Sequence, residues 1–392
     1  MPDDSGQISI RAIDRISQIS AEQWDACALA ADGTGNPFVQ HAFLHALEES
    51  RSVGHRSGWQ PHHLVAEASD GTLLGALPLY VKSHSQGEYV FDHGWARAYE
   101  HAGGRYYPKL QVSVPFTPAP GPRLLVQSGE HADAVADGLA EALIEVCSRN
   151  RLSSVHVTFC GERECALLER HGFLHRLGMQ YHWHNHDYKT FEEFLAALSS
   201  RKRKAIRKER QSVQRDGLVL EALTGADIKS RHWDAFFAFY MDTGSRKWGS
   251  PYLTRSFFDL LGATMADRVV LIIASSENKM VGGALNLRSD DALFGRNWGC
   301  NESYSFLHFE ACYYQAIDFA IRNGLKRVEA GAQGEHKIQR GYLPVVTHSM
   351  HWIRDDGLRE PVDRFLRQER AAMQQEAVAL MQLSPFRKDG ES

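Results

Sequence analysis

Apolar and polar positions in the second half of the chain predict three strands, a helix, a strand, a short helix and a last strand. The strands are rich in Val, Ile, Leu and aromatic residues and lie at 269–274, 281–287, 292–298, 327–330 and 345–353. The first two flank the turn 276–279 and so predict a hairpin. Apolar residues recur at helical spacing from about 305 to 322, and a short helical segment at 335–340 precedes Gly341.

The first half of the chain repeats this order with weaker signals. Its predicted strands lie at 63–67, 73–82, 89–92, 124–126, 155–159 and 180–188. Its predicted helices lie at 132–147, where one face is apolar, and at 166–170. The repeated order indicates an internal structural duplication without obvious sequence identity.

One further segment lies between the two predicted halves, and another follows the second half. Thr190 and Glu193 form a capping box that opens a helix through Leu198, and a basic run follows at 201–210. Residues 361–383 are polar with scattered apolar positions and predict a peripheral helix. We expect an N-terminal domain at 1–189, a C-terminal domain with the catalytic cleft at 190–360 and a peripheral tail at 361–392.

Composition narrows the class of protein. The chain has 392 residues, 43% of them hydrophobic and 23% charged, with a mean hydropathy of -0.38, which excludes a disordered, fibrous or membrane-spanning protein. The formal net charge of -4 argues against a protein that coats nucleic acid with its whole surface. Six cysteines without a CxxC motif, an acidic N-terminal segment and no run of about 18 apolar residues lead us to expect reduced thiols and a cytoplasmic location.

The segments 191–208, 297–299, 305–324, 329–331 and 337–342 resemble the FemABX peptidoglycan aminoacyltransferases, and the order of elements resembles two units of the GNAT acyltransferase fold in tandem. The segments 106–111, 246–252 and 334–342 are similar, more narrowly, to a bacterial family of FemAB-like predicted N-acyltransferases. The resemblance implies an α/β (α+β) fold of two tandem GNAT-like acyltransferase domains with mixed central sheets. It also implies acyl transfer to an amine.

The turn before the predicted helix at 305–322 bears on the acyl donor. GNAT enzymes that use acetyl-CoA usually bind its pyrophosphate at a glycine-rich turn, because the free N–H groups and the dipole of a helix N-terminus favour anions. Residues 299–305 contain one glycine, and the charge of Glu302 would repel a pyrophosphate. Acyl-CoA as co-substrate and aminoacyl-tRNA therefore both stay open as donors, and we expect no metal.

Residues 329–337 leave a predicted strand, enter a predicted helix and gather two carboxylates, an imidazole and an ammonium. Strand ends are where α/β folds place chemistry. Acyl transfer to an amine needs a proton acceptor, a donor for the oxyanion and a proton path for the leaving group. The expected catalytic residues are Glu335 and His336, ranked above Glu329 as proton acceptors, with Lys337 and Tyr342. A solvated helix start and a core tyrosine are the structural alternatives.

Two loops and a strand end are candidates for binding. The loop 245–252 joins two cations to two aromatic rings, which suits an anionic group beside a flat one, and 106–109 precedes a Pro-rich stretch longer than most connections. The expected substrate-binding residues are Arg246, Lys247, Trp248, Tyr252, Tyr106, Tyr107 and Lys109. The expected cofactor-binding residues are Asn297, Trp298, Gly299, Arg340 and Gly341. Gly299 is also where we expect the third and fourth strands to part. Packing against the core is the alternative in each case.

Two other patterns point less strongly to a ligand. The basic run 201–210 has the charge to follow the phosphates of tRNA, but it lacks aromatic residues for base stacking, and such runs are most often solvated faces. The histidines at 182–186 share one face of a predicted strand, yet the outer two would lie about 13 Å apart, so we expect no metal there. His171 and His175 are expected at the surface.

These observations favour an N-acyltransferase that moves an acyl group from acyl-CoA to a primary amine by direct attack. Two alternatives stay open: an aminoacyl-tRNA-dependent aminoacyltransferase of the FemABX type that acts on a cell-wall precursor, and a non-catalytic binding module of the same fold. The expected partners are a small-molecule or peptide amine acceptor and, at 201–210, tRNA. No membrane span is expected.

Overall fold

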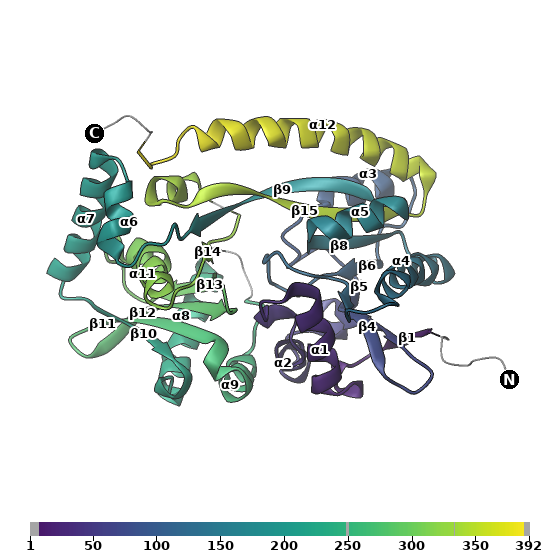
Figure 1. Ribbon diagram of the computed structural model, residues 1–392, viewed down its shortest axis with the longest axis horizontal. Coiled ribbons are helices and arrows are strands. Elements are labelled where there is room, and N and C mark those ends of the chain that lie inside the picture. Colours follow the sequence, from purple (N-terminus) through teal and green to yellow (C-terminus); the bar gives the residue numbers. More distant parts are fainter. Residues whose placement is uncertain (1–7, 248–250, 333, 388–392) are drawn as a thin grey trace. The chain divides into compact units, whose positions relative to one another are not determined.

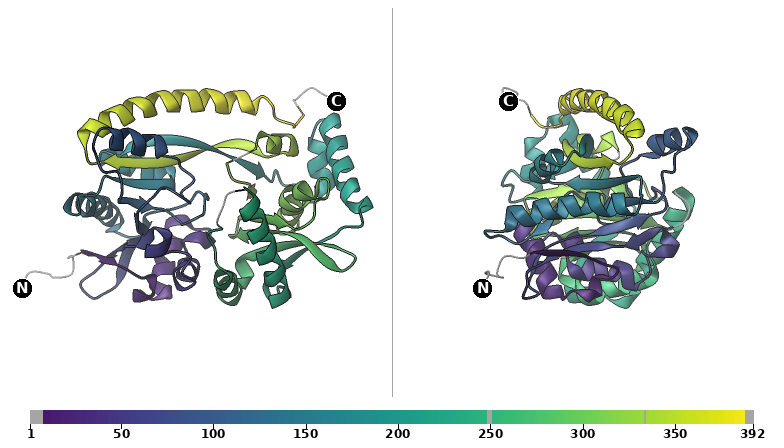
Figure 2. Two further views of the ribbon diagram at one scale, coloured as in Figure 1. Left: turned by 180° about the vertical axis from the view of Figure 1, so that it is seen from behind. Right: turned by 90° about the vertical axis from the view of Figure 1, so that its right-hand side faces the viewer.

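The structure, a computed structural model, describes residues 8–247, 251–332 and 334–387, without the side chains of 245–247 (Figures 1 and 2). The chain divides into two compact units, each built from two segments. The first unit comprises Met1–Gly178 and Val346–Gln374, and the second comprises Met179–Val345 and Gln375–Ser392. No helix in the described part of the chain is long and apolar enough to cross a membrane.

The first unit contains strands from two sheets. A four-stranded antiparallel sheet has the order β1-β3-β4-β7, formed by Ser9–Ile13, His63–Glu67, Leu73–Leu77 and Leu125–Val126. The strands of its other sheet run in the order β15-β8-β6-β5-β2, formed by Leu343–Ile353, Ser154–Cys160, Lys109–Val112, Leu79–Lys82 and Trp59–Pro61. Only the β6 and β8 pair among these is parallel. All seven residues of β8 are buried, as expected for a strand covered on both faces.

The helices of the first unit are α1 (Ala21–Asp32), α2 (His41–Glu49), α3 (His93–His101), α4 (Ala132–Arg149) and α5 (Glu162–Arg170). The predicted helices at 132–147 and 166–170 are thus confirmed as α4 and α5. The predicted strand at 73–82 is interrupted at Pro78, which has no N–H for the ladder, and its two parts join different sheets. The predicted strand at 89–92 is wrong, because these residues form a loop that leads into α3.

The second unit has one mixed sheet in the order β10-β11-β12-β13-β14-β9. These strands are Val219–Thr224, Val269–Ser276, Lys279–Arg288, Ala292–Cys300, Arg327–Glu329 and Leu174–His184, of which the last begins in the first unit. All neighbours are antiparallel except β13 and β14. The hairpin, the third strand and the strand at 327–330 are therefore confirmed.

The helices of the second unit include α6 (Phe191–Ala197), α7 (Ser200–Arg215), α8 (Ser230–Lys247), α9 (Arg255–Thr264), α10 (Leu307–Phe309) and α11 (Gln315–Arg322). A π-helical turn at Glu310–Tyr314 joins α10 to α11, so the predicted helix at 305–322 is one helical segment with a wide turn inside it. A 3-10 helix, η7, spans Glu335–Arg340. The tail forms α12 (Asp356–Met381), which confirms the predicted C-terminal helix.

The last strand of each predicted half completes the sheet of the other unit. Residues 182–184 of β9 pair with β14 in the second unit. Residues 348–353 of β15 pair with β8 in the first unit. The units consequently divide after residues 178, 345 and 374, whereas the sequence leads us to expect domain ends at 189 and 360.

Candidate functional site

The end of β14 in the second unit holds the chemistry expected from residues 329–337. The strand ends at Glu329, and the next two residues continue its pairing: Ala330 N–H donates to the Tyr181 carbonyl at 3.0 Å, and Tyr181 N–H donates to the Gly331 carbonyl at 3.1 Å. Gly331 has a φ of +74°, which turns the chain away from the sheet toward η7. We call Glu329, Lys337 and the carbonyls of Ala330 and Gly331 the β14 end.

Glu329 is the buried acid of the β14 end. Its Oε1 accepts a hydrogen bond from Arg327 Nε at 2.9 Å, whereas its Oε2 is buried without a hydrogen-bond partner among the described residues. His182 Nε2 lies 3.8 Å from that oxygen, and burial lowers the pKa of His182 to about 3, so this imidazole is neutral at pH 7. Burial raises the pKa of Glu329 to about 7. Its carboxyl group can therefore gain or lose a proton near neutral pH.

Lys337 lies in η7, and its ammonium turns back toward the strand. Its Nζ donates to the carbonyls of Ala330 and, at 3.4 Å, Gly331, and no carboxylate of the described residues forms an ion pair with it. Burial lowers the pKa of Lys337 to about 8. A buried lysine of this kind can lose its proton far more readily than a solvated one.

The other three expected catalytic residues lie in different surroundings. Glu335 and His336 are exposed, and His336 Nε2 is 3.1 Å from the hydroxyl of Tyr313. Burial lowers the pKa of His336. Tyr342 is completely buried and donates its hydroxyl to the Tyr313 carbonyl at 3.1 Å, which is the arrangement of a core tyrosine.

The strands β13 and β14 part close to this end. They pair only between Ala292–Phe294 and Arg327–Glu329, while β13 continues to Cys300 with β12 as its partner. The parting therefore begins after Phe294 and not at Gly299. Gly299 instead permits close packing, because a Cβ there would lie 2.3 Å from the Phe239 carbonyl oxygen.

The remaining expected cofactor-binding residues make contacts within the second unit. Arg340 donates to Glu209 Oε1 at 2.8 Å, and its guanidinium lies 3.6 Å from the centre of the Phe309 ring. Gly341 adopts a φ of +92° as the C-cap of η7. Asn297 pairs with β12, and the Trp298 ring lies 5.6 Å from that of His308. Whether these residues touch a donor stays a prediction.

The aromatic and basic loop at 245–252 is only partly described. Trp248 and the side chains of Arg246 and Lys247 lie outside the described residues. Tyr252 is exposed, and its backbone N–H donates to the hydroxyl of Tyr240 at 3.0 Å. A binding role for this loop stays a prediction.

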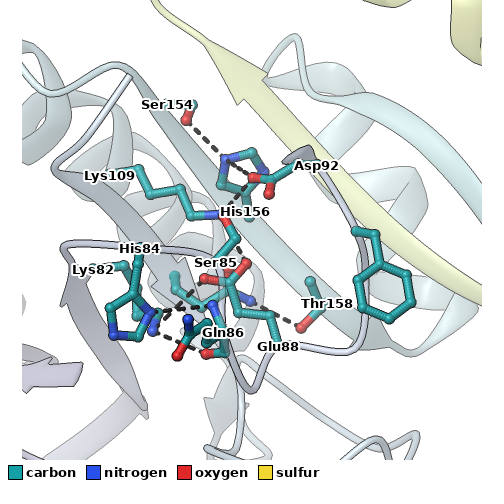
Figure 3. Close-up of polar contacts among 12 residues, drawn as sticks. Lys82, His84, Ser85, Gln86, Glu88, Asp92, Lys109, Ser154, His156 and Thr158 are labelled. Atoms are coloured by element: carbon teal, nitrogen blue, oxygen red, sulfur yellow. Dashed lines mark hydrogen bonds and ion pairs between the residues drawn. The ribbon is translucent and has the colours of Figure 1, made fainter. Parts of the chain in front are cut away.

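The expected residues Tyr106, Tyr107 and Lys109 meet in the first unit, in a group that we call the lysine cluster. The lysine cluster consists of Lys82, Ser85, Glu88, Asp92, Tyr106, Tyr107, Lys109 and His156. Figure 3 shows Lys109 reaching Ser85, Glu88 and Asp92, and its Nζ is 2.8 Å from Ser85 Oγ and 2.7 Å from Glu88 Oε2. Tyr106 donates to Asp92 at 2.6 Å, and the Tyr107 hydroxyl is 2.8 Å from Ser85 Oγ.

The lysine cluster is buried, and burial dominates its electrostatics. Burial raises the pKa of Glu88 to about 7 and lowers that of Lys82 to about 7. Burial also works to raise the pKa of Asp92, but the charge of Lys109 reverses this and leaves that pKa below its ordinary value. Lys109 and Tyr106 are fully buried, so their contacts here are internal to the unit.

The sequence analysis missed the partners of Lys109, namely Ser85, Glu88, Asp92 and His156. One signal was present, because the sequence of the first unit contains only two lysines. Lys82 lies at the end of the predicted strand 73–82, and Lys109 lies beside Tyr106 and Tyr107. Glu88 Oε1 and Asp92 Oδ1 are also buried without hydrogen-bond partners in the described structure. Such atoms are rare in folded proteins and mark a polar interior that packing alone does not explain.

Helix α7 carries the basic run 201–210. Three of its cations form pairs: Arg207 with Glu192, Arg210 with Glu310 at 3.0 Å, and Lys202 with Gln339 at 3.0 Å. Arg203 donates to the Ala196 carbonyl at 3.5 Å. The remaining three, Arg201, Lys204 and Lys208, are exposed, and within the described residues they have no ion pair. Their spacing places them on one face of the helix.

A model of the FemAB-like family, described as peptidoglycan biosynthesis/recognition, matches residues 15–388. The chain belongs to the FemAB-like family. Family membership confirms the expectation of a transferase related to acyltransferases. No curated protein matches the sequence.

Solved structures support the fold of this FemAB-like protein. FemX matches with a TM-score of 0.55 at 13% identity, covering 88% of this chain and 98% of FemX. A C-terminal domain from Agrobacterium fabrum, named as a candidate lysylphosphatidylglycerol synthetase, matches with a TM-score of 0.55 at 8% identity, covering 88% and 95%. A Bacteroides thetaiotaomicron protein of unknown function matches with a TM-score of 0.53 at 11% identity, covering 88% and 100%. The expected α/β fold with mixed central sheets is thus confirmed.

Proposed function

We propose that this FemAB-like protein transfers an acyl group to a primary amine by direct attack at the β14 end. The observation that carries the proposal is the buried carboxylate of Glu329, which has one unpartnered oxygen and a pKa of about 7 beside the point where β13 and β14 part. A proton acceptor works best when its pKa lies near the working pH. Glu329 meets this condition, and the solvent-exposed Glu335 offers no comparable environment.

The proposed reaction needs no covalent enzyme intermediate. The amine nitrogen bonds to the acyl carbon, Glu329 accepts a proton from that nitrogen, and the bond from carbon to the leaving group breaks. Lys337, whose pKa is about 8, supplies the proton that a departing thiolate or hydroxyl requires, and solvent restores both groups. Main-chain N–H groups of β13 beyond Phe294 are the proposed donors to the oxyanion.

Acyl-CoA is the first donor that we propose, because acyltransferases that resemble the GNAT fold commonly bind such a thioester where two strands of the sheet separate. The acceptor that we propose is an amine of a peptidoglycan precursor, in accordance with the description of the family. The negative charge of Glu302 weighs against a pyrophosphate at the helix start, although Lys279, at 3.3 Å, offsets part of that charge.

Aminoacyl-tRNA is the second donor, and α7 gives a specific reason to test it. Arg201, Lys204 and Lys208 present on one exposed face three charges that have no ion pair among the described residues. Phosphate contacts made by such charges supply most of the sequence-independent affinity for nucleic acid. K204E/K208E should then weaken tRNA binding strongly at low salt and weakly at high salt. CoA binding should be unchanged in this variant.

Titration calorimetry with a panel of CoA thioesters and a filter assay with charged tRNA distinguish the donors. Heat with a thioester and no retention of tRNA would identify acyl-CoA, and the reverse would identify aminoacyl-tRNA. With the donor known, E329Q should reduce the acylation rate by about 100-fold or more, because general-base catalysis contributes roughly that much. The exposed E376Q serves as the matched control. An unchanged rate in E329Q, or a comparable loss in E335Q alone, would contradict the assignment of Glu329.

A further inference from the structure

Two cysteines and two histidines of the first unit come together away from any role assigned above. Cys160 ends β8, Cys165 lies in α5, His175 begins β9 and His348 lies in β15. His348 is far from the other three in the sequence and meets them because β15 pairs with β8, where His348 is the partner residue of Cys160. We call these four residues the Cys/His group.

Three ligand atoms of the Cys/His group already converge, and the fourth, Cys160 Sγ, lies beside one of them. Cys165 Sγ and one ring nitrogen each from His175 and His348 all lie within 4.8 Å of one another. His175 Nε2 is 3.0 Å from His348 Nδ1, and the two sulfurs of Cys160 and Cys165 are 3.8 Å apart. A tetrahedral zinc ion with Zn–S bonds of about 2.3 Å and Zn–N bonds of about 2.0–2.1 Å separates two sulfurs by about 3.8 Å and two nitrogens by about 3.3 Å.

The outward nitrogens of both histidines face carboxylates. His175 Nδ1 lies 3.3 Å from Glu169 Oε1, and His348 Nε2 lies 3.6 Å from Glu162 Oε1. Both carboxylates are exposed and lie within ion-pair distance; a ring that donates its N–H outward to such a carboxylate has the lone pair of its inner nitrogen available for a metal ion. Metal-ligating histidines characteristically have such partners, which fix the tautomer and the ring orientation.

The two facing nitrogens can be joined in two ways. Without a metal, one ring can donate its N–H to the other across the 3.0 Å between His175 Nε2 and His348 Nδ1. A metal ion instead takes the lone pairs of both nitrogens together with the thiolates of the cysteines. A disulfide between Cys160 and Cys165 would remove the thiolates and so exclude the second arrangement.

We propose that Cys160, Cys165, His175 and His348 bind one Zn²⁺ in a tetrahedral site. Mixed thiolate and imidazole ligands suit zinc and do not suit Mg²⁺ or Ca²⁺, which take oxygen ligands. Binding displaces one proton from each thiol to solvent, and no redox change occurs. Four protein ligands leave no open position, which makes the site structural, and it ties α5 to the strands β8, β9 and β15.

The first test measures metal in the full-length protein by elemental analysis after exchange into zinc and gel filtration. We expect about one zinc per chain, and at least tenfold less in C165A and in H175A. The matched control is H171A, because His171 is a half-buried histidine that pairs with Asp137 at 2.8 Å and lies outside the Cys/His group. Wild-type protein without zinc, or equal zinc in C165A and wild type, would overturn the proposal.

The second test uses wild-type protein alone, so a variant that fails to fold does not affect it. Cobalt replacing zinc should give intense visible bands of tetrahedral Co²⁺ and a near-ultraviolet band from thiolate ligands, which zinc then removes. Weak octahedral bands would mean adventitious surface binding and would overturn the site. A mass lower by two hydrogens in the unreduced protein, without metal, would show a Cys160–Cys165 disulfide and would also overturn it.

Discussion

Replacing Lys109 with Met tests whether the lysine cluster holds the first unit together. Met has a similar length and no charge, so the change removes the ammonium without leaving a large cavity. It abolishes the contacts of Nζ with Ser85, Glu88 and Asp92. The carboxylates of Glu88 and Asp92 are then left buried, and among the described residues the remaining lysine or arginine in an ion pair with either of them is Lys82, 3.9 Å from Glu88.

The size of the effect follows from the burial of these charges. Lys109, Glu88 and Asp92 are all almost completely buried, and removing one partner of a buried ion pair costs about 3–5 kcal/mol. For a unit of this size each kcal/mol lowers the melting temperature by about 2–4 °C. K109M should therefore melt roughly 6–20 °C below the wild type. R149M, which removes an exposed cation at the end of α4, should change stability by less than about 0.5 kcal/mol.

The effect should also depend on pH in a fixed direction. In the wild type the pKa of Asp92 lies below its ordinary value, so its stabilising contribution is present above about pH 4 and is lost as the pH falls through lower values. In K109M the charge of Lys109 no longer opposes the effect of burial on Asp92, so the pKa of Asp92 rises. At low pH the carboxylate of Asp92 is then protonated, which removes the cost of a buried, unpaired charge from the variant. Calorimetric melts at about pH 7 and about pH 4.5 should show a gap between wild type and variant that narrows on acidification. A gap below about 1 kcal/mol at neutral pH, or one that widens with acid, would refute this reasoning.

Three further predictions concern the second unit and the packing of single glycines. Y342F removes a buried hydroxyl that donates to a backbone carbonyl, and urea titration should show a loss of about 1–2 kcal/mol. G299A places a methyl group 2.3 Å from the Phe239 carbonyl oxygen and should cost about 1–3 kcal/mol by the same method, whereas G94A, with open space around it, should cost nothing measurable. Because burial raises the pKa of Glu329 to about 7 and lowers that of Lys337 to about 8, the acylation rate should increase as the pH rises through about 7 and fall again above about 8, where Lys337 loses its proton; a flat profile from about pH 6 to 9 would exclude this pair.

The sequence predicted most elements of the fold because their signals are local. The spacing of apolar residues in α4 and the length of the runs in β11 to β13 are properties of short windows of sequence. The strand predicted at 89–92 failed for the opposite reason. Asp92 serves a lysine 17 residues away, and that partnership fixes the loop more firmly than the β propensity of Tyr89 and Val90.

The candidate site was predicted in part. The segment 329–337 was correctly singled out as a strand end rich in ionisable groups, but the relative burial of its members depends on tertiary packing. Glu329 becomes the buried acid because β9 pairs with β14 and brings His182 opposite it. Glu335, ranked from the sequence with His336 above Glu329, is exposed at the start of η7. Nothing in the spacing of these residues distinguishes the two carboxylates.

The last strand of each predicted half, β9 or β15, pairs in the other unit. This explains why neither the pairing of His182 with Glu329 nor the Cys/His group could be predicted from one half of the sequence alone. His182 reaches Glu329 only because β9 leaves the first predicted half and completes the second sheet. His348 reaches Cys165 and His175 only because β15 returns to the first sheet. Long-range pairings of this kind have no local signature, since each strand would look the same with any partner. In each unit, therefore, a strand from the other half of the sequence supplies one of the side chains. Neither half of the sequence contains the complete set of residues for either group.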